Sequence, residues 1–121
     1  MKIQILGSSA AKPVPRPFCS CRGCRVAREE GGKSFRTRTS VSMYLGEDGP
    51  STVRYKVDLG PDVAYHAIRF GESLANLEHL LYTHAHPDHV VPYWLNVRAE
   101  IISDAAGMTP LHVWALSLIH I

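Results

Sequence analysis

The chain has 121 residues, which is enough for one domain of modest size. A hydrophobic content of 45% and a charged content of 20% are those of an ordinary globular protein and exclude intrinsic disorder. The net charge of +2 excludes a strong overall preference for nucleic acid or a membrane surface.

The first predicted element is a short strand over Lys2–Leu6 that enters a turn at Gly7. Gln4 interrupts this apolar stretch and no small-residue cleavage site follows, so the segment is not a signal peptide. No stretch approaches the ~18–20 apolar residues of a membrane span. We therefore expect a cytoplasmic protein without a membrane partner.

The next segment is rich in proline and basic residues. Three prolines predict an extended loop over residues 10–18, and the composition of Cys24–Glu30 predicts a helix that Gly31 ends. Eight of the thirteen basic side chains lie between Lys12 and Arg38. A solvated surface is the simpler interpretation of this charge, and a positive rim that attracts an anionic substrate is the alternative.

The rest of the chain alternates strands and helices. Strands are predicted over 40–45 and 52–58 around a turn at 47–50, with Val53, Tyr55 and Val57 pointing inward. There follow a helix over 61–70 that Gly71 closes, a strand over 78–82, a helix over 92–102 and a strand over 111–115. This order predicts an α/β fold with its chemistry at the carboxyl ends of the strands.

The end of the chain predicts an incomplete domain. The chain stops inside the apolar run "LHVWALSLIHI", and about five strands leave sheet faces without cover. The tail over residues 116–121 resembles the translated read-through of a sequencing adapter. We therefore expect an N-terminal portion of a domain over residues 1–115, followed by a non-native tail over 116–121.

The segment "YTHAHPDHV" crowds metal-capable side chains directly after an apolar strand. His84 and His86 are two residues apart, so their side chains project the same way from an extended loop and can bind one ion. Asp88 and His89 follow where the chain turns toward a helix, which directs them to a second ion. Imidazole and carboxylate ligands suit Zn, Mn or Fe. The spacing therefore predicts a dinuclear metal site.

A second candidate site is the run of Cys19, Cys21 and Cys24. Three thiolates at this spacing can reach one tetrahedral ion, with a fourth ligand still to be supplied. A Cys21–Cys24 disulfide would leave Cys19 unpaired, and three free buried thiols are the third possibility. We favour a structural zinc ion.

The order His84-x-His86-x-Asp88-His89 resembles the signature of the metallo-β-lactamase-fold hydrolases, and "YKVDLG" resembles their earlier aspartate motif at Asp58. The resemblance implies an αββα sandwich of which this chain is the N-terminal half. It assigns His84 and His86 to the first metal, Asp88 and His89 to the second, and a supporting role to Asp58. The family's further histidines and bridging aspartate have no counterpart in this chain, so we expect the fragment alone to be inactive.

The cysteine loop narrows the resemblance. It is similar to a branch that includes the phosphonate-pathway cyclic phosphodiesterase and the pyrroloquinoline-quinone biosynthesis protein B, whose members carry this loop as a zinc site. In the phosphodiesterase the fourth zinc ligand is a histidine far downstream. True β-lactamases lack the loop, which argues against antibiotic hydrolysis.

The function that follows is metal-dependent hydrolysis of a small phosphodiester, cyclic or linear. Two divalent ions, Zn or Mn, would make water reactive, and Asp88 would hold a metal and orient the nucleophile as the catalytic residue. Arg36 or Arg38 is a candidate phosphate contact on charge alone. The alternatives are a nuclease or tRNA-processing relative with a nucleic-acid partner, and a non-hydrolytic metal-binding accessory protein. A homodimer is compatible with each.

Overall fold

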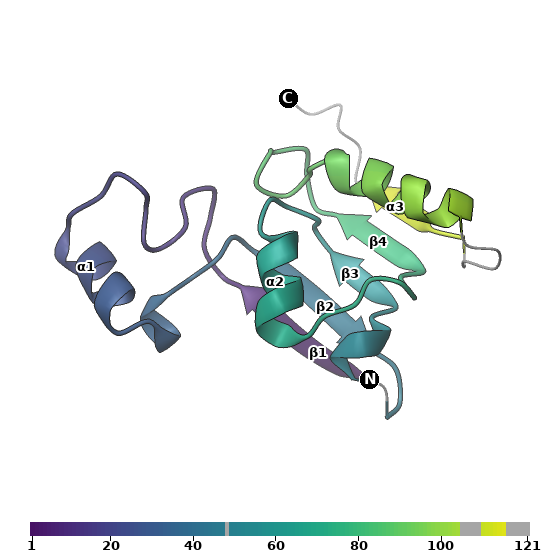
Figure 1. The fold of residues 1–121 in the computed structure, drawn as a ribbon, viewed down its shortest axis with the longest axis horizontal. Coiled ribbons are helices and arrows are strands. Elements are labelled where there is room, and N and C mark those ends of the chain that lie inside the picture. Colours follow the sequence, from purple (N-terminus) through teal and green to yellow (C-terminus); the bar gives the residue numbers. More distant parts are fainter. Residues whose placement is uncertain (48, 105–109, 116–121) are drawn as a thin grey trace.

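The computed structural model describes residues 1–47, 49–104 and 110–115. The predicted non-native tail over 116–121 lies outside these residues. One mixed sheet forms the centre of the fold (Figure 1). Its strands are β1 (Lys2–Gly7), β2 (Ser40–Tyr44), β3 (Tyr55–Val57), β4 (His79–Tyr82) and β5 (His112–Ala115). They lie side by side in chain order, β1 to β3 antiparallel and β3 to β5 parallel.

The helices are α1 (Arg22–Glu29), α2 (Val63–Phe70) and α3 (Tyr93–Asp104), with single 3₁₀ turns η1 (Gly32–Ser34) and η2 (Pro50–Thr52). As predicted, α2 stops at Gly71, whose left-handed φ of 65° costs a glycine little. In Figure 1, α2 and α3 lie over one face of the sheet, while α1 lies beside it on a long loop. Within the described ranges, no helix is long and apolar enough to cross a bilayer.

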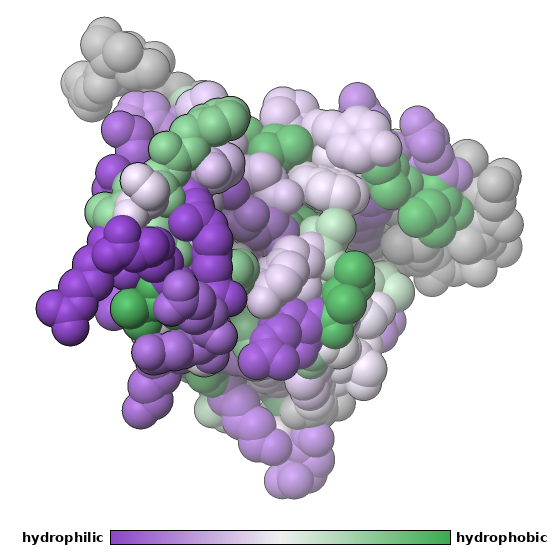
Figure 2. Space-filling view, turned by 60° about the vertical axis from the view of Figure 1, so that its left-hand side comes forward, coloured by the Kyte–Doolittle hydropathy of each residue, from purple (hydrophilic) through white to green (hydrophobic). Residues whose placement is uncertain are grey.

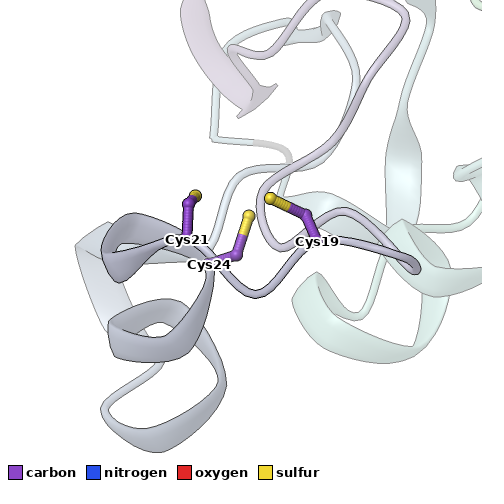
Figure 3. Close-up of side chains that lie close together, drawn as sticks. All are labelled: Cys19, Cys21 and Cys24. Carbon is purple, nitrogen blue, oxygen red and sulfur yellow. The ribbon is translucent and has the colours of Figure 1, made fainter.

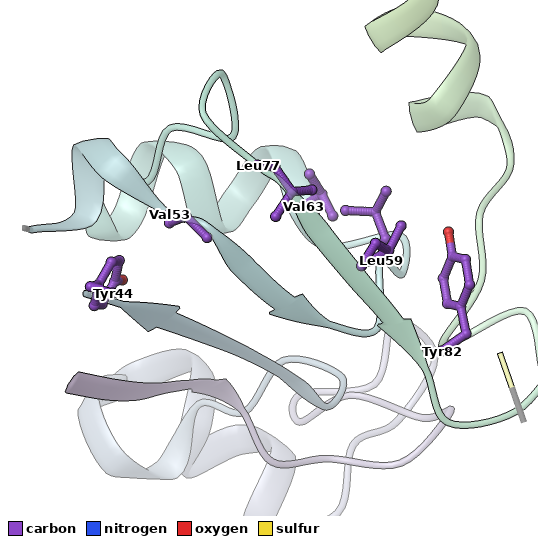
Figure 4. Close-up of a cluster of buried hydrophobic side chains, with 7 residues drawn as sticks. Tyr44, Val53, Leu59, Val63, Leu77 and Tyr82 are labelled. Atoms are coloured by element: carbon purple, nitrogen blue, oxygen red, sulfur yellow. The ribbon is translucent and has the colours of Figure 1, made fainter. Parts of the chain in front are cut away.

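The hydrophobic core lies between this sheet face and its two helices (Figure 4). Its buried members come from the strand ends, α2 and the loops: Tyr44, Val53, Leu59, Val63, Leu77, Leu80 and Tyr82. Trp94 and Leu95 of α3 pack against them. Burying such side chains contributes about 1.5–3 kcal/mol each. This packing fixes β4, and therefore the loop that follows it.

The prediction that Tyr55 and Val57 point inward was wrong. Lys56, between them, is the residue under the helices, and it is fully buried. Its Nζ lies 2.9 Å from both carboxylate oxygens of Glu72 and 3.0 Å from the hydroxyl of Ser42. Burial lowers the pKa of Lys56, and the charge of Glu72 opposes that shift. The buried and exposed positions of this strand are therefore the reverse of those expected. The alternation of residues in a strand does not tell which face the helices cover.

The opposite face of the sheet is largely apolar, and no helix of the described residues covers it. Register places Ile3, Met43, Tyr55, His79 and His112 in one row across the five strands. The next row on this face is Ile5, Val41, Val57, Leu81 and Trp114. The tyrosine and the two histidines of the first row stack, with centroids 4.8 and 5.1 Å apart. Both faces of this sheet thus carry side chains suited to burial, as in a central layer of a sandwich.

Candidate metal centres

The histidine loop, residues 83–89, begins where β4 ends. Backbone hydrogen bonds hold it against the segment that follows β3. The backbone N–H of Leu59 donates to the carbonyl of His89, and that of Val91 donates to the carbonyl of Leu59. A Cβ added to Gly60 would lie 2.2 Å from the carbonyl oxygen of Asp88, so glycine permits this approach. Two neighbouring parallel strands therefore bring both motifs to one edge of the sheet.

Asp58 holds the histidine loop in place through hydrogen bonds from its side chain. Its carboxylate is fully buried and accepts hydrogen bonds from the backbone N–H of Thr83, at 2.9 Å, and from the Thr83 hydroxyl. The other strong contact is to Nδ1 of His89, 2.6 Å from Oδ2. Asp58 has a left-handed φ of 59°, a conformation that is costly for a residue with a side chain. The contacts of the buried carboxylate with Thr83 and His89 therefore stabilise a backbone conformation that is otherwise unfavourable.

These bonds set the imidazole tautomers. A carboxylate can only accept, so Nδ1 of His89 donates to Asp58, and in the neutral ring Nε2 holds the lone pair that a metal would need. The single hydrogen of the Thr83 hydroxyl goes to Asp58, which makes Nδ1 of His84, 3.0 Å from that hydroxyl, a donor as well. Nε2 of His84 is then also free to bind a metal. Thr83 had no place in the sequence-based site, although it directly precedes the motif.

The four predicted ligands fall into two pairs. Nε2 of His84 lies 3.1 Å from Nδ1 of His86, and Nε2 of His89 lies 3.2 Å from Oδ2 of Asp88. Two donors of one tetrahedral zinc ion stand about 3.3 Å apart. The rings of His84 and His89 have centroids 4.0 Å apart, so the two pairs adjoin. His86 is exposed and the other three are partly buried, which leaves the pairs open to a ligand.

Cys19, Cys21 and Cys24 converge independently of this site (Figure 3). Their sulfur atoms lie within 4.8 Å of one another and form no disulfide. Across the described ranges, this is the one set of three or more histidine, cysteine or carboxylate donors that converges so closely. Two thiolates on one tetrahedral zinc stand about 3.8 Å apart, so the triad fits an ion with a fourth position left over.

Backbone groups near the triad position its sulfur atoms and change the pKa values of its thiols. Cys21 is the N-cap of α1, and the backbone N–H of Arg16 donates to Sγ of buried Cys24 at 3.4 Å. The backbone N–H of Cys24 lowers the pKa of Cys21 to about 7, and bonds from the two neighbouring thiols add to this effect. For Cys19, the backbone N–H of Cys21 lowers the pKa, but the neighbouring thiols outweigh it and the pKa is raised.

The two arginines considered as phosphate contacts are placed differently. Arg38 is engaged: its guanidinium donates to Asp62 at 2.9 Å and to the carbonyl of Ala11 at 3.1 Å. Arg36 is exposed, and its side chain has no hydrogen bond or ion pair to any described residue. Neither makes a bond to the histidine loop within the described ranges.

Comparison with solved structures gives the fold. The chain superposes on a new diphosphatase from the PhnP family with a TM-score of 0.68 and 26% identity, over 92% of this chain and 39% of that one. It superposes on Zn(2+)-bound PqqB from Methylobacterium extorquens with a TM-score of 0.63 and 23% identity, over 94% of this chain and 46% of that one. The chain has the metallo-β-lactamase fold. The sequence-based assignment of fold and branch is confirmed, and the chain is related to a hydrolase.

Curated relatives match in sequence over shorter stretches. Coenzyme PQQ synthesis protein B of Bradyrhizobium diazoefficiens is 32% identical over 63 residues, 52% of this chain and 19% of that protein. A Porphyromonas gingivalis protein named octanoyltransferase is 36% identical over 90 residues, 74% of this chain and 16% of that protein. The chain thus spans less than a fifth of either relative. Most of the protein named octanoyltransferase lies outside the matched stretch. No family model matches the chain.

Proposed function

We propose that this chain is part of a metal-dependent hydrolase that acts on a small phosphodiester, cyclic or linear. The observation that carries the proposal is the arrangement of two donor pairs, at 3.1 and 3.2 Å, above one buried carboxylate. The relationship to a diphosphatase supports phosphoryl chemistry. The presence of zinc in a PqqB structure supports a metal-binding role for the fold.

The residues have separate roles. His84 and His86 would hold one divalent ion, and Asp88 and His89 a second, each Zn or Mn. When bound, such ions lower the pKa of water and neutralise charge that builds on phosphoryl oxygens. Asp58 keeps the proton on Nδ1 of His89, and Thr83 does the same for His84, so both Nε2 atoms stay available. Asp88 would in addition orient the attacking oxygen.

The cysteine triad would hold one structural zinc ion. Its sulfurs come from a single six-residue segment, so an ion there would fix the loop before α1 without help from the sheet. A fourth donor would close the coordination shell and leave no position for substrate. The triad therefore supports structure and not hydrolysis.

The test is turnover of bis-p-nitrophenyl phosphate, with added Mn or Zn, by the full-length gene product of which this chain is expected to be the N-terminal portion. A His84→Ala, His86→Ala double variant should lose at least about 100-fold in rate, because one donor pair is removed. The control is the double variant Arg22→Ala, Glu29→Ala, which removes two exposed side chains of α1. It should keep its rate. Equal rates for the wild type and the His84/His86 variant would refute the proposal.

A non-hydrolytic accessory role is the second candidate, and the likeness to PQQ synthesis protein B favours it. In that role the same donor pairs would bind metal without turning over an ester. Full metal occupancy together with no turnover of phosphodiester, carboxylic ester or short RNA substrates would select the accessory role over hydrolysis.

A further inference from the structure

A hollow lies between α1, the segment before β2, and α2. Its volume is about 710 Å³, within the ~300–1,000 Å³ range of small-molecule sites. None of its lining residues belongs to the cysteine triad or the histidine loop. Figure 2 shows the molecule turned so that the α1 side comes forward, where strongly hydrophilic side chains gather.

The charge of this hollow is wholly positive. Arg28 of α1, Arg36 of the following segment and Arg69 of α2 line it, and no acidic side chain of the described ranges does. Arg28 donates to the carbonyl of Arg16 at 2.7 Å. Neither Arg36 nor Arg69 has a hydrogen bond or ion pair from its side chain to any residue in the described ranges. Three arginines from three segments line the hollow without a carboxylate from the described residues, which favours a multiply charged anion.

Aromatic side chains form the other part of the lining. Phe35 and Tyr65 stand with ring centroids 5.5 Å apart and an interplanar angle of 40°. Each is 38% exposed, so ring surface remains open to a ligand. Exposed rings beside guanidinium groups are the combination that binds a flat base next to a phosphate.

We propose that this hollow binds the nucleoside monophosphate unit, with its phosphate on Arg36 and Arg69 and its base on Phe35 and Tyr65. A simple inorganic anion would not use the rings, and an uncharged aromatic molecule would not use the arginines. The unit can come from a free nucleotide or from the 5′-phosphorylated end of an RNA. The site is separate from the proposed metal centre, so this inference does not depend on the proposed hydrolysis.

Isothermal titration calorimetry with AMP, ribose 5-phosphate and adenosine tests the two halves of the site. AMP should bind at least about tenfold more tightly than either fragment, because stacking and charge each contribute. Equal affinities for AMP and ribose 5-phosphate, or no binding of AMP at millimolar concentration, would overturn the proposal. A 5′-phosphorylated RNA tetranucleotide that binds more tightly than AMP identifies an RNA end as the source, and equal affinity identifies the free nucleotide.

Variants locate the binding. Arg36→Gln with Arg69→Gln should weaken AMP at least about tenfold, while a charge-matched control, Lys2→Gln with Arg22→Gln, should leave it unchanged. All four side chains are exposed, so the fold tolerates both pairs of changes. Tyr65→Leu should weaken AMP and leave ribose 5-phosphate unaffected. If the His84/His86 variant loses AMP binding while the Arg36/Arg69 variant keeps it, the nucleotide binds at the metal centre and the proposal is wrong.

Discussion

The two candidate metal centres are built in opposite ways. The cysteine triad is local: six consecutive positions bring three sulfurs within 4.8 Å of one another on a loop and one helix turn. The histidine loop depends on the sheet, because the buried Asp58 of a neighbouring strand segment sets its side chains. In the first site the donors themselves converge, and in the second a carboxylate that is not a ligand arranges them. If this difference controls metal binding, loss of a cysteine donor and loss of Asp58 should each affect a different site.

The largest effect should follow the loss of a local donor. Cys24→Ser removes one of three sulfurs, and the remaining two cannot retain zinc, so the chain should lose one equivalent of it. Among the described residues, no hydrogen bond or ion pair joins the histidine loop to this segment, so the loop should keep its metal. Inductively coupled plasma mass spectrometry of both proteins measures the two populations. Simultaneous loss of all metal would show that the sites are coupled.

Asp58→Ala should have the opposite selectivity. Without the carboxylate, His89 and Thr83 lose their partner, and metal affinity at the histidine loop should fall about 10–100-fold. Zinc on the triad should be unaffected. Cobalt titration followed by visible absorption distinguishes thiolate from imidazole ligation. The control is Asp62→Asn, which alters a partly buried ion pair with Arg38. An equal loss in this control would argue against a specific role for Asp58.

A smaller effect is expected from Gly60→Ala. The new Cβ would lie 2.2 Å from the carbonyl oxygen of Asp88, so the loop must move away from the strand. Affinity of the histidine loop should fall about tenfold, at the lower end of the effects of supporting residues. Gly49→Ala, where no atom lies within 4 Å of the added carbon, is the matched control. Unchanged metal binding in Gly60→Ala would show that the close approach is not required.

The smallest effect concerns the reactivity of the triad. The pKa of Cys21 is lowered to about 7 from 9.0, so in metal-free protein half of this thiol is ionised near neutral pH. Its rate of alkylation by iodoacetamide should rise with pH and reach half its maximum near pH 7. Peptide mass spectrometry from pH 5 to 9 follows the reaction at each cysteine. A midpoint near pH 9 would contradict the lowered pKa.

Much of this architecture could be predicted from sequence. The strand before "YTHAHPDHV", the helix stop at Gly71 and the order of strands and helices all depend on local signals, and the structure confirms them. The convergence of the cysteines is also local. In contrast, the burial of Lys56 depends on Glu72, which is sixteen residues away, and on the helices that cover one sheet face. Periodicity alone contains neither fact.

The support beneath the histidine loop shows the same limit. The motif resemblance indicated Asp58, but not its bond to Nδ1 of His89 or the role of Thr83 as the link between them. Those contacts exist because β3 and β4 are parallel neighbours. The pairing of two strands cannot be predicted from the sequence of either strand alone. The fit of Gly60 against Asp88 likewise requires the paired backbone. Sequence therefore named the candidate donors, and the structure adds how their side chains are positioned.

The most direct test of the histidine loop is the metal content of a chain without its cysteines. In a Cys19→Ser, Cys21→Ser, Cys24→Ser variant, any transition metal that remains must bind elsewhere. We predict that plasma mass spectrometry will find bound Zn or Mn in this variant, and that adding His84→Ala and His86→Ala will remove at least part of it. A triple variant that folds and carries no transition metal would contradict the central claim.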